Sequence, residues 1–211
     1  MDIHAPESPV NSFKDFAIHI AIVTLGILIA LGLEGLREIV YEHHLVHETR
    51  ENFRVEMEQS KEHMNVEMKR VARSSELLKT LAAEAPTLGQ QHPEQVADRL
   101  DAIKNPNYLF ATNSWQTALS TGVLAHMSAQ EVSTYAWGAE GTRIYTGLQA
   151  ETRESETAAM VYWRSHPHPT PEQIAEGQER ILRFARAEQT LADVGPQTLR
   201  GFQHALDAAS R

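Results

Sequence analysis

Residues 16–33 read FAIHIAIVTLGILIALGL, a run of eighteen residues without a formal charge. An α-helix of this length rises about 27 Å, close to the thickness of the hydrocarbon core of a bilayer. A helix satisfies its own backbone hydrogen bonds, which lipid cannot do, and no proline interrupts the run. We therefore expect a transmembrane helix over residues 16–36, preceded by a short N-terminal tail over residues 1–15.

A cleaved signal peptide is the alternative interpretation of this segment. Ala30-Leu31-Gly32 provides small residues of the kind found at a cleavage site. The apolar run is longer than the usual core of a signal peptide, and the helical pattern continues from Glu34 to Glu38. We therefore favour an uncleaved anchor.

Positive charge predicts the orientation of the anchor. Lys14 and the amino terminus lie on the short side, whereas Arg37 is the only Lys or Arg on the other side before Arg50. The positive-inside rule then places the N-terminus in the cytoplasm. The C-terminal part would lie outside it, which is the periplasm in a Gram-negative bacterium. The chain has no cysteine, so its composition does not indicate the redox state of the compartment.

One face of the predicted span carries residues that suit helix packing in a membrane. His19, Val23, Gly26 and Ala30 are spaced by four, three and four residues, so they align along one side of a helix. Gly26 and Ala30 form a small-xxx-small pair, which lets another helix approach closely. His19 either faces such a partner or lies near enough to the end of the span to reach the lipid headgroups.

The helical pattern continues past the anchor, because no glycine or proline occurs between Arg37 and Ala85. Apolar residues recur there at spacings of three and four, as in a buried helix face or a coiled-coil seam. We assign the predicted interaction seam to Leu36, Ile39, Val40, Val46, Phe53, Met57 and Met64. The pattern predicts a stalk helix over residues 37–84.

The rest of the chain, residues 85–211, is expected to form a helical bundle that packs on the distal stalk. Residues 85–93, APTLGQQHP, predict a loop, and Gly195-Pro196 predicts a later break. Residues rich in helix propensity dominate and strand-like alternation is scarce. The predicted fold class is therefore all-α, with four or five helices packed against the long one.

Shorter signals predict where the helices of this bundle begin and end. Ser128-Ala-Gln-Glu131 and Thr170-Pro-Glu-Gln173 are capping boxes that open two long helices. Asn105-Pro106-Asn107 ends an earlier helix, and Gly122 closes the helix that begins near Trp115. Three glycines at 138, 141 and 147 indicate a kink or a break in the helix after Ser128.

Several patches of the chain resemble one group of proteins. They are Gly26–Glu34, His43–Glu48, Arg50–Asn52 and Trp115–Gly122. They are similar to bacterial membrane proteins without an assigned activity, which have a short N-terminal tail, one anchor helix and a helical remainder. The resemblance implies a bacterial, inner-membrane protein, and it implies no functional residues.

The densest group of potential ligands is His43-His44-x-x-His47-Glu48. On a helix His43 and His47 point the same way and can bind one Zn²⁺ or Cu²⁺ through two imidazoles. Two ligands do not complete a site, and the order HExxH is absent because Glu48 follows the second histidine. Histidine also titrates near neutral pH, so the group can sense protons. The alternative is that these side chains lie at headgroup level beside Tyr41.

Aromatic residues provide the other candidate site. Trp115, Tyr135 and Trp163 would line a ligand cleft, although aromatic residues at helical spacing more often form a core. The sequence contains no Gly-rich phosphate loop, no GxSxG motif and no cysteine nucleophile. We therefore expect neither an enzyme nor a cofactor.

Two functions fit these observations. The net charge of −9 and the lack of a basic stripe argue against a nucleic-acid partner. The first function is a structural or interaction subunit, anchored in the membrane, which self-associates or belongs to a larger membrane complex. The alternative is an extracytoplasmic sensor or binding module for a small ligand, a metal or protons.

Overall fold

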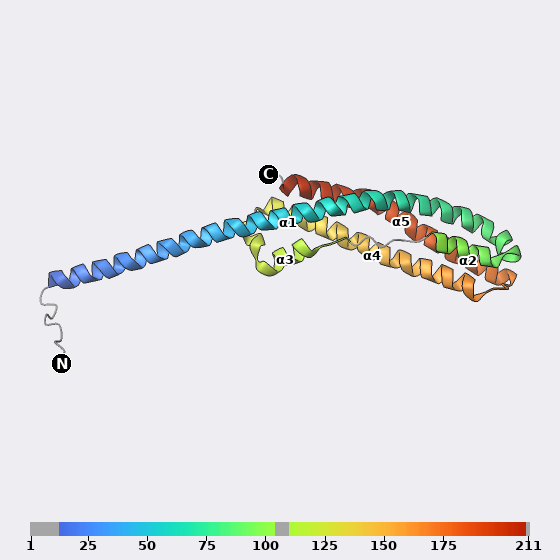
Figure 1. The fold of residues 1–211 in the computed structure, drawn as a ribbon, viewed down its shortest axis with the longest axis horizontal. Coiled ribbons are helices and arrows are strands. Elements are labelled where there is room, and N and C mark those ends of the chain that lie inside the picture. Colours follow the sequence, from blue (N-terminus) through green and yellow to red (C-terminus); the bar gives the residue numbers. More distant parts are fainter. Residues whose placement is uncertain (1–12, 104–109, 210–211) are drawn as a thin grey trace, which may run out of the picture. The chain divides into compact units, whose positions relative to one another are not determined.

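The computed structural model describes residues 13–103 and 110–209, and its regular elements there are all helices (Figure 1). The predicted all-α class is confirmed for these residues. The elements are α1 (Phe13–Gln91), α2 (Pro93–Ala102), α3 (Asn113–Thr121), the 3₁₀ helix η1 (Val123–His126), α4 (Ala129–Ser165) and α5 (Pro171–Ala209). The first twelve residues and the predicted stop at Asn105-Pro106-Asn107 lie outside the described residues.

The chain divides into two compact units, residues 1–47 and residues 48–211. In the first unit the described residues form one helix, the N-terminal part of α1. Its apolar side chains over residues 16–33 are uncovered: Ile22 is 63% exposed and Leu31 is 64% exposed. By length and composition this helix is a candidate membrane span.

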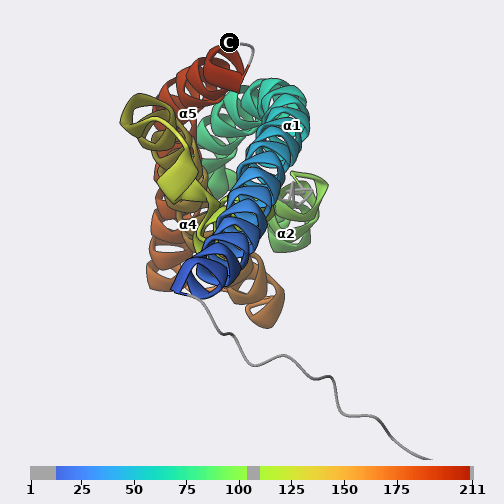
Figure 2. The same ribbon diagram turned by 90° about the vertical axis from the view of Figure 1, so that its left-hand side faces the viewer.

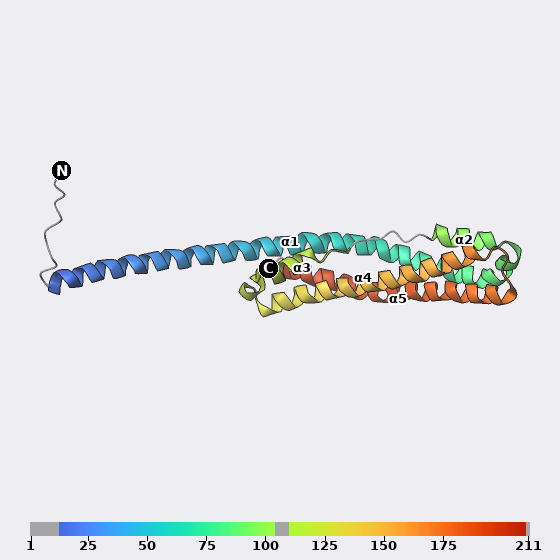
Figure 3. The same cartoon turned by 90° about the horizontal axis from the view of Figure 1, so that it is seen from below.

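The second unit is a bundle of three long helices, the distal part of α1 together with α4 and α5. Figures 2 and 3 show α4 and α5 side by side, and α2 packs against α4. One continuous apolar core lies around the turn between α1 and α2. It contains Leu78, Leu81, Ala82, Ala85, Val96, Ala97, Leu100, Ile103, Ala159, Trp163, Ile174, Ile181, Phe184 and Ala185.

The loop predicted over residues 85–93 is wrong, because α1 continues to Gln91 with Pro86 inside it. A proline removes the hydrogen bond that its N–H would donate to the carbonyl four residues earlier, here that of Ala82. In this bundle Gln178 of α5 donates from Nε2 to that carbonyl oxygen at 2.9 Å. A side chain from another helix therefore replaces the missing backbone donor.

The breaks predicted at glycines in the long helices are also wrong. α5 continues through Gly195 and Pro196 to Ala209, and α4 is continuous from Ala129 to Ser165. A Cβ on Gly138 would lie 3.6 Å from Ala205 Cβ, and one on Gly195 would lie 3.1 Å from Met68 Cγ. Gly195 thus permits a close approach of Met68, whereas Gly138 makes contacts of ordinary length. Packing around both glycines compensates for their low helix propensity.

The predicted helix boundaries at the two capping boxes are confirmed. Thr170 Oγ1 accepts from the N–H of Gln173 at 3.3 Å, and Gln173 Oε1 accepts from the N–H of Thr170 at 2.8 Å. Ser128 Oγ accepts from the N–H of Glu131 at 3.2 Å. Gly122 has φ = 73° and ends α3 in the left-handed conformation, which glycine adopts without steric cost.

Candidate functional site

The predicted packing face of the span lies on one uninterrupted helix. Its four residues, His19, Val23, Gly26 and Ala30, are all exposed. His19 Nδ1 donates to the backbone carbonyl of Asp15 at 2.8 Å. A Cβ built on Gly26 would have no neighbour within 4 Å. The face has the open, small surface that a second helix requires, and its role in helix packing stays a prediction.

The histidine pair lies on α1 as the spacing predicts, and both side chains are exposed. His43 and His47 are one helical turn apart, and His44 beside them is exposed as well. Within residues 13–103 and 110–209 no group of three or more His, Cys, Asp or Glu could hold a metal ion. A metal at this pair would need ligands from elsewhere.

The predicted seam divides into an exposed and a buried part. The exposed residues are Leu36, Ile39 and Val40, and the buried ones are Val46, Phe53, Met57 and Met64. The ring of Phe53 stacks on Tyr135 of α4, with 4.2 Å between centroids and 8° between planes. From Phe53 onward the stripe therefore packs against the chain's own helices.

The three aromatic residues proposed for a cleft lie in two separate sets of contacts. Trp115 is half-buried and meets Phe53 at 6.3 Å between centroids, so it shares that ring with Tyr135. Trp163 packs against Gly89 and Gly177, and its Nε1 donates to the carbonyl of Gly177 at 3.3 Å. Tyr135 and Trp163 are each 1% exposed, so both are core residues.

An ion pair joins α1 to the start of α4. The carboxylate of Glu131 accepts from Arg50 Nε at 2.6 Å and from Arg50 Nη2 at 3.0 Å. Tyr135 Oη donates to the same carboxylate at 3.4 Å. Burial, and then the charge of Glu131, raises the pKa of the Tyr135 hydroxyl. The side chain of Glu131 therefore joins α4 to α1, while its backbone N–H completes only half of the capping box.

A carboxylate of α1 serves as the cap of α3. Glu56 Oε2 accepts from the N–H of Ser114 at 2.9 Å and from its Oγ at 3.0 Å. The residue at the N-cap position, Thr112, makes no side-chain capping bond. An anion at a helix N-terminus is favoured by the unpaired N–H groups and by the helix dipole. Glu56 thus holds the short helix α3 against the bundle.

The most unusual polar group in the bundle is the central cluster, formed by Glu67 and Arg70 of α1 and Glu188 of α5. Both carboxylates have zero exposure, and the Arg70 side chain is 13% exposed. Arg70 donates to Glu67 from Nε at 2.7 Å and from Nη2 at 2.9 Å. It also donates to Glu188 from Nη1 at 2.9 Å and from Nη2 at 3.3 Å. One guanidinium therefore forms hydrogen bonds and ion pairs with two buried carboxylates.

The electrostatics of the central cluster are dominated by burial. Burial raises the pKa of Glu188, the charge of Arg70 opposes this rise, and the charge of Glu67 adds to it. Burial, followed by the charge of Glu67, raises the pKa of Tyr145. Burial and the charge of Glu188 likewise raise the pKa of the half-buried Glu156 on α4. All three shifts favour the protonated form.

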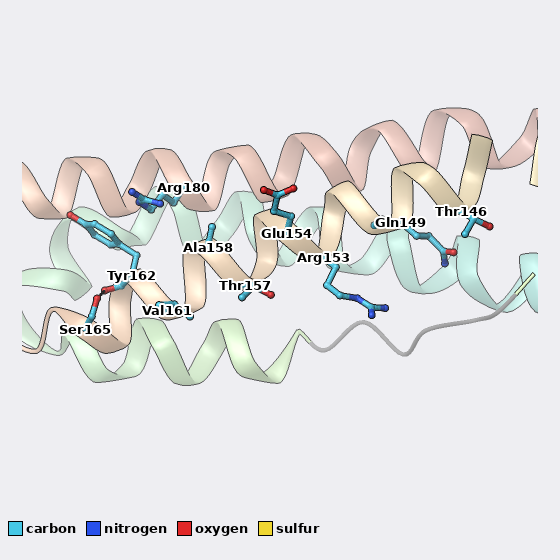
Figure 4. Close-up of a pocket in the computed structure, with 11 residues that line it drawn as sticks. Thr146, Gln149, Arg153, Glu154, Thr157, Ala158, Val161, Tyr162, Ser165 and Arg180 are labelled. Atoms are coloured by element: carbon cyan, nitrogen blue, oxygen red, sulfur yellow. Dashed lines mark hydrogen bonds between the residues drawn. The ribbon is translucent and has the colours of Figure 1, made fainter. Parts of the chain in front are cut away.

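A groove of about 840 Å³ runs along α4 (Figure 4). Its lining residues are Thr146, Gln149, Ala150, Arg153, Glu154, Thr157, Ala158, Val161, Tyr162, Ser165 and Arg180. At one end the Arg180 guanidinium lies 4.6 Å from the Tyr162 ring centroid, and the ring of His166 stacks on Tyr162 at 4.3 Å. Towards the other end Gln149 Nε2 donates to Glu67 Oε1 at 3.2 Å. Gln149 thus links the groove to the central cluster.

Sequence reasoning missed the central cluster, although one signal marks it. Glu188 interrupts the apolar spacing of α5, in which Phe184, Ala185 and Leu191 are all buried. A carboxylate on the buried face of a helix needs a partner, because burying an unpaired charge is costly. The partner, Arg70, lies 118 residues away in the chain, so local spacing does not identify it.

Comparison of the chain with protein-family models, with curated proteins and with solved structures finds no match. The geometry of the chain's own residues therefore carries the functional inference.

Proposed function

We propose that this chain is a single-pass, membrane-anchored helical protein that acts as a structural or interaction subunit. It would self-associate or belong to a larger membrane complex. The main support is the uncovered apolar segment at residues 16–33, whose side chains are exposed without exception. Moving a large apolar side chain out of water is worth about 1.5–3 kcal/mol, so lipid is a far better solvent for this segment than water.

The proposed orientation follows from charge and from the resemblance. The N-terminus would face the cytoplasm, and residues 48–211 would lie in the periplasm of a bacterial inner membrane. Lys14 before the segment, and the scarcity of Lys and Arg after it, support this orientation.

The proposed contact with a partner helix lies in residues 16–40. The face of His19, Val23, Gly26 and Ala30 is open there, and Leu36, Ile39 and Val40 are exposed beyond it. The bundle, in contrast, buries Phe53, Met57 and Met64 of the seam in its own core, with Met64 at zero exposure. It therefore needs no partner to cover that stripe.

Membrane insertion is tested by charge substitution in the apolar segment. Leu25→Arg combined with Leu28→Arg should move the chain from the carbonate-resistant membrane fraction to the soluble fraction, because arginine at the centre of a span costs about 2.5–3.5 kcal/mol. Val66→Arg is the matched control, since Val66 is an exposed apolar residue of the bundle. A wild-type chain that is extracted by carbonate would contradict the anchor.

Assembly is tested by measuring the mass of the full chain in nanodiscs and of complexes drawn from native membranes. Gly26→Ile should lower the oligomer mass or release the partner, because the added side chain blocks close approach. Gly32→Ile, on another face of the same helix, should not. A wild-type chain that is monomeric and without a partner would refute the interaction function.

The groove along α4 favours the binding module as the second candidate. Its volume of about 840 Å³ lies within the usual range for ligand pockets. Its lining is apolar at Ala150, Ala158 and Val161, and it carries two positive charges, Arg153 and Arg180, and one negative charge, Glu154. A screen of amphipathic anions against the full chain, with Val161→Glu as the blocking variant, would test it.

A further inference from the structure

We propose that the central cluster of Glu67, Arg70 and Glu188 is a proton-binding site that couples pH to the packing of α5 against α1. This inference goes beyond the proposed function and depends neither on a membrane nor on a partner. It assigns proton sensing to buried carboxylates, whereas the sequence pattern predicts it for the exposed His43 and His47.

The charges of the central cluster do not balance. With every group ionised, the central cluster holds two negative charges and one positive charge, and both carboxylates are completely buried. An uncompensated charge in a protein interior is costly. One bound proton removes the excess and leaves a neutral cluster.

The described groups around the central cluster do not supply the missing positive charge. From α4 the cluster is faced by Tyr145, Gln149 and Glu156, and Ser74 of α1 accepts from Arg70 Nη1 at 3.3 Å. Arg153 of α4 and Asp101 of α2 act on Glu156, with opposite signs. The hydroxyl of Tyr145 is buried and makes no hydrogen bond within the described residues, so it does not stabilise either carboxylate.

The two carboxylates of the central cluster differ in the hydrogen bonds that they accept, and this difference decides which of them binds the proton. The five N–H groups of a guanidinium match the five donor contacts of Arg70, two to each glutamate and one to Ser74. Glu67 has a further donor in Gln149. Within residues 13–103 and 110–209, Glu188 accepts from Arg70 alone, and one of its two bonds is 3.3 Å long. The anion of Glu188 is the less stabilised one, so Glu188 binds the proton.

Proton binding at Glu188 makes the stability of the fold depend on pH. The pKa of Glu188 is raised in the folded chain, chiefly by burial, so the folded state holds this proton more tightly than the unfolded state. By linkage, the proton on Glu188 contributes to the free energy of unfolding, and this contribution is largest at acidic pH. It is lost as the pH rises through the pKa of Glu188 in the folded chain. Because Glu188 is on α5 and its partners are on α1, the loss weakens the packing of these two helices.

The site is tested with the full chain in detergent micelles by infrared spectroscopy between pH 4 and 9. The wild type should show a protonated-carboxyl C=O band that persists above the range in which exposed carboxyls titrate. Glu188→Gln should lose the larger part of this band, and the half-buried Glu156, whose pKa is also raised by burial, accounts for any remainder. Glu154→Gln should retain it, because Glu154 is an exposed carboxylate that does not belong to the cluster.

Thermal unfolding provides the second measurement on the same samples. The melting temperature of the wild type should fall as the pH rises, and Glu188→Gln, which mimics the protonated form, should be less sensitive to pH. Each tenfold gain in the proton affinity of the folded state is worth about 1.4 kcal/mol, or roughly 3–6 °C for a chain of this size.

A further variant keeps the test decisive if Glu188→Gln does not fold. Glu67→Gln removes the neighbouring negative charge, so Glu188 becomes the only anion that pairs with Arg70 in the central cluster. Its ionised form is then better stabilised, and the band should titrate at lower pH than in the wild type. A wild-type band that disappears together with the exposed carboxyls would overturn the proposal. So would a band that is unchanged in both variants.

Discussion

The side-chain amide of Gln178 donates to the backbone carbonyl of Ala82 at 2.9 Å, across the interface between α5 and α1. This carbonyl would ordinarily accept from the N–H of residue 86, which is a proline. The contact explains how a helix passes through a residue that usually ends one. It joins residues that are 96 positions apart in the chain.

Gln178→Ala should lower the free energy of unfolding by about 1–3 kcal/mol, because it leaves a half-buried carbonyl without a donor. In a Pro86→Ala background the backbone N–H returns, so the cost of Gln178→Ala should shrink. Denaturant unfolding of the four chains of this double-mutant cycle measures the coupling. Gln197→Ala, an exposed change on the same helix, is the control, and a coupling energy of zero would contradict the compensation.

Gly177→Ala should destabilise the bundle by more than 2 kcal/mol, as overpacking in a dense core does. A Cβ there would lie 2.6 Å from Trp163 Cζ2 and 2.7 Å from Cε2. Gly147→Ala is the matched change on α4, because its Cβ would meet nothing within 4 Å. It should stabilise the helix by up to about 1 kcal/mol. Trp163→Phe should rescue Gly177→Ala, and equal effects of the two alanines would argue against the close contact.

Phe53→Ala should cost about 3–5 kcal/mol, the usual range for deleting a buried aromatic ring. Phe53 is 1% exposed and stacks on Tyr135. Ile39→Ser, in the exposed part of the same seam, should leave bundle unfolding unchanged and lower the oligomer mass. Thermal unfolding and mass measurement on both variants separate the two halves of the seam. A large loss of bundle stability in Ile39→Ser would show that this residue is also a core residue.

Glu56→Ala should loosen α3 specifically, because Ser114 loses the acceptor of both its N–H and its Oγ. Loss of a cap costs about 0.5–2 kcal/mol. Amide hydrogen exchange should rise in Asn113–Thr121 and stay unchanged in the distal half of α4. Glu58→Ala, on the exposed face of α1, should change neither region. Uniform exchange across the bundle in Glu56→Ala would indicate global destabilisation instead.

The sequence alone determined the features that depend on neighbours three or four residues away. The helical class, the start of α5 at its capping box, the N-cap at Ser128 and the end of α3 at Gly122 were all predicted from such local patterns. The uninterrupted apolar helix at residues 16–33 follows from composition, and its place in a membrane stays a prediction.

Tertiary structure decided the rest, because it depends on residues that meet only after the chain has folded. Proline at 86 and at 196 predicted breaks, yet both helices continue, and at Pro86 the amide of Gln178 replaces the missing backbone donor. The side chain of Glu131 pairs with Arg50 instead of completing its capping box. Glu188 meets Arg70 from 118 residues away. A buried charge, or a carbonyl without its donor, is costly unless it is paired. For Glu188 and for the Ala82 carbonyl the partner comes from another helix, and local spacing does not identify it.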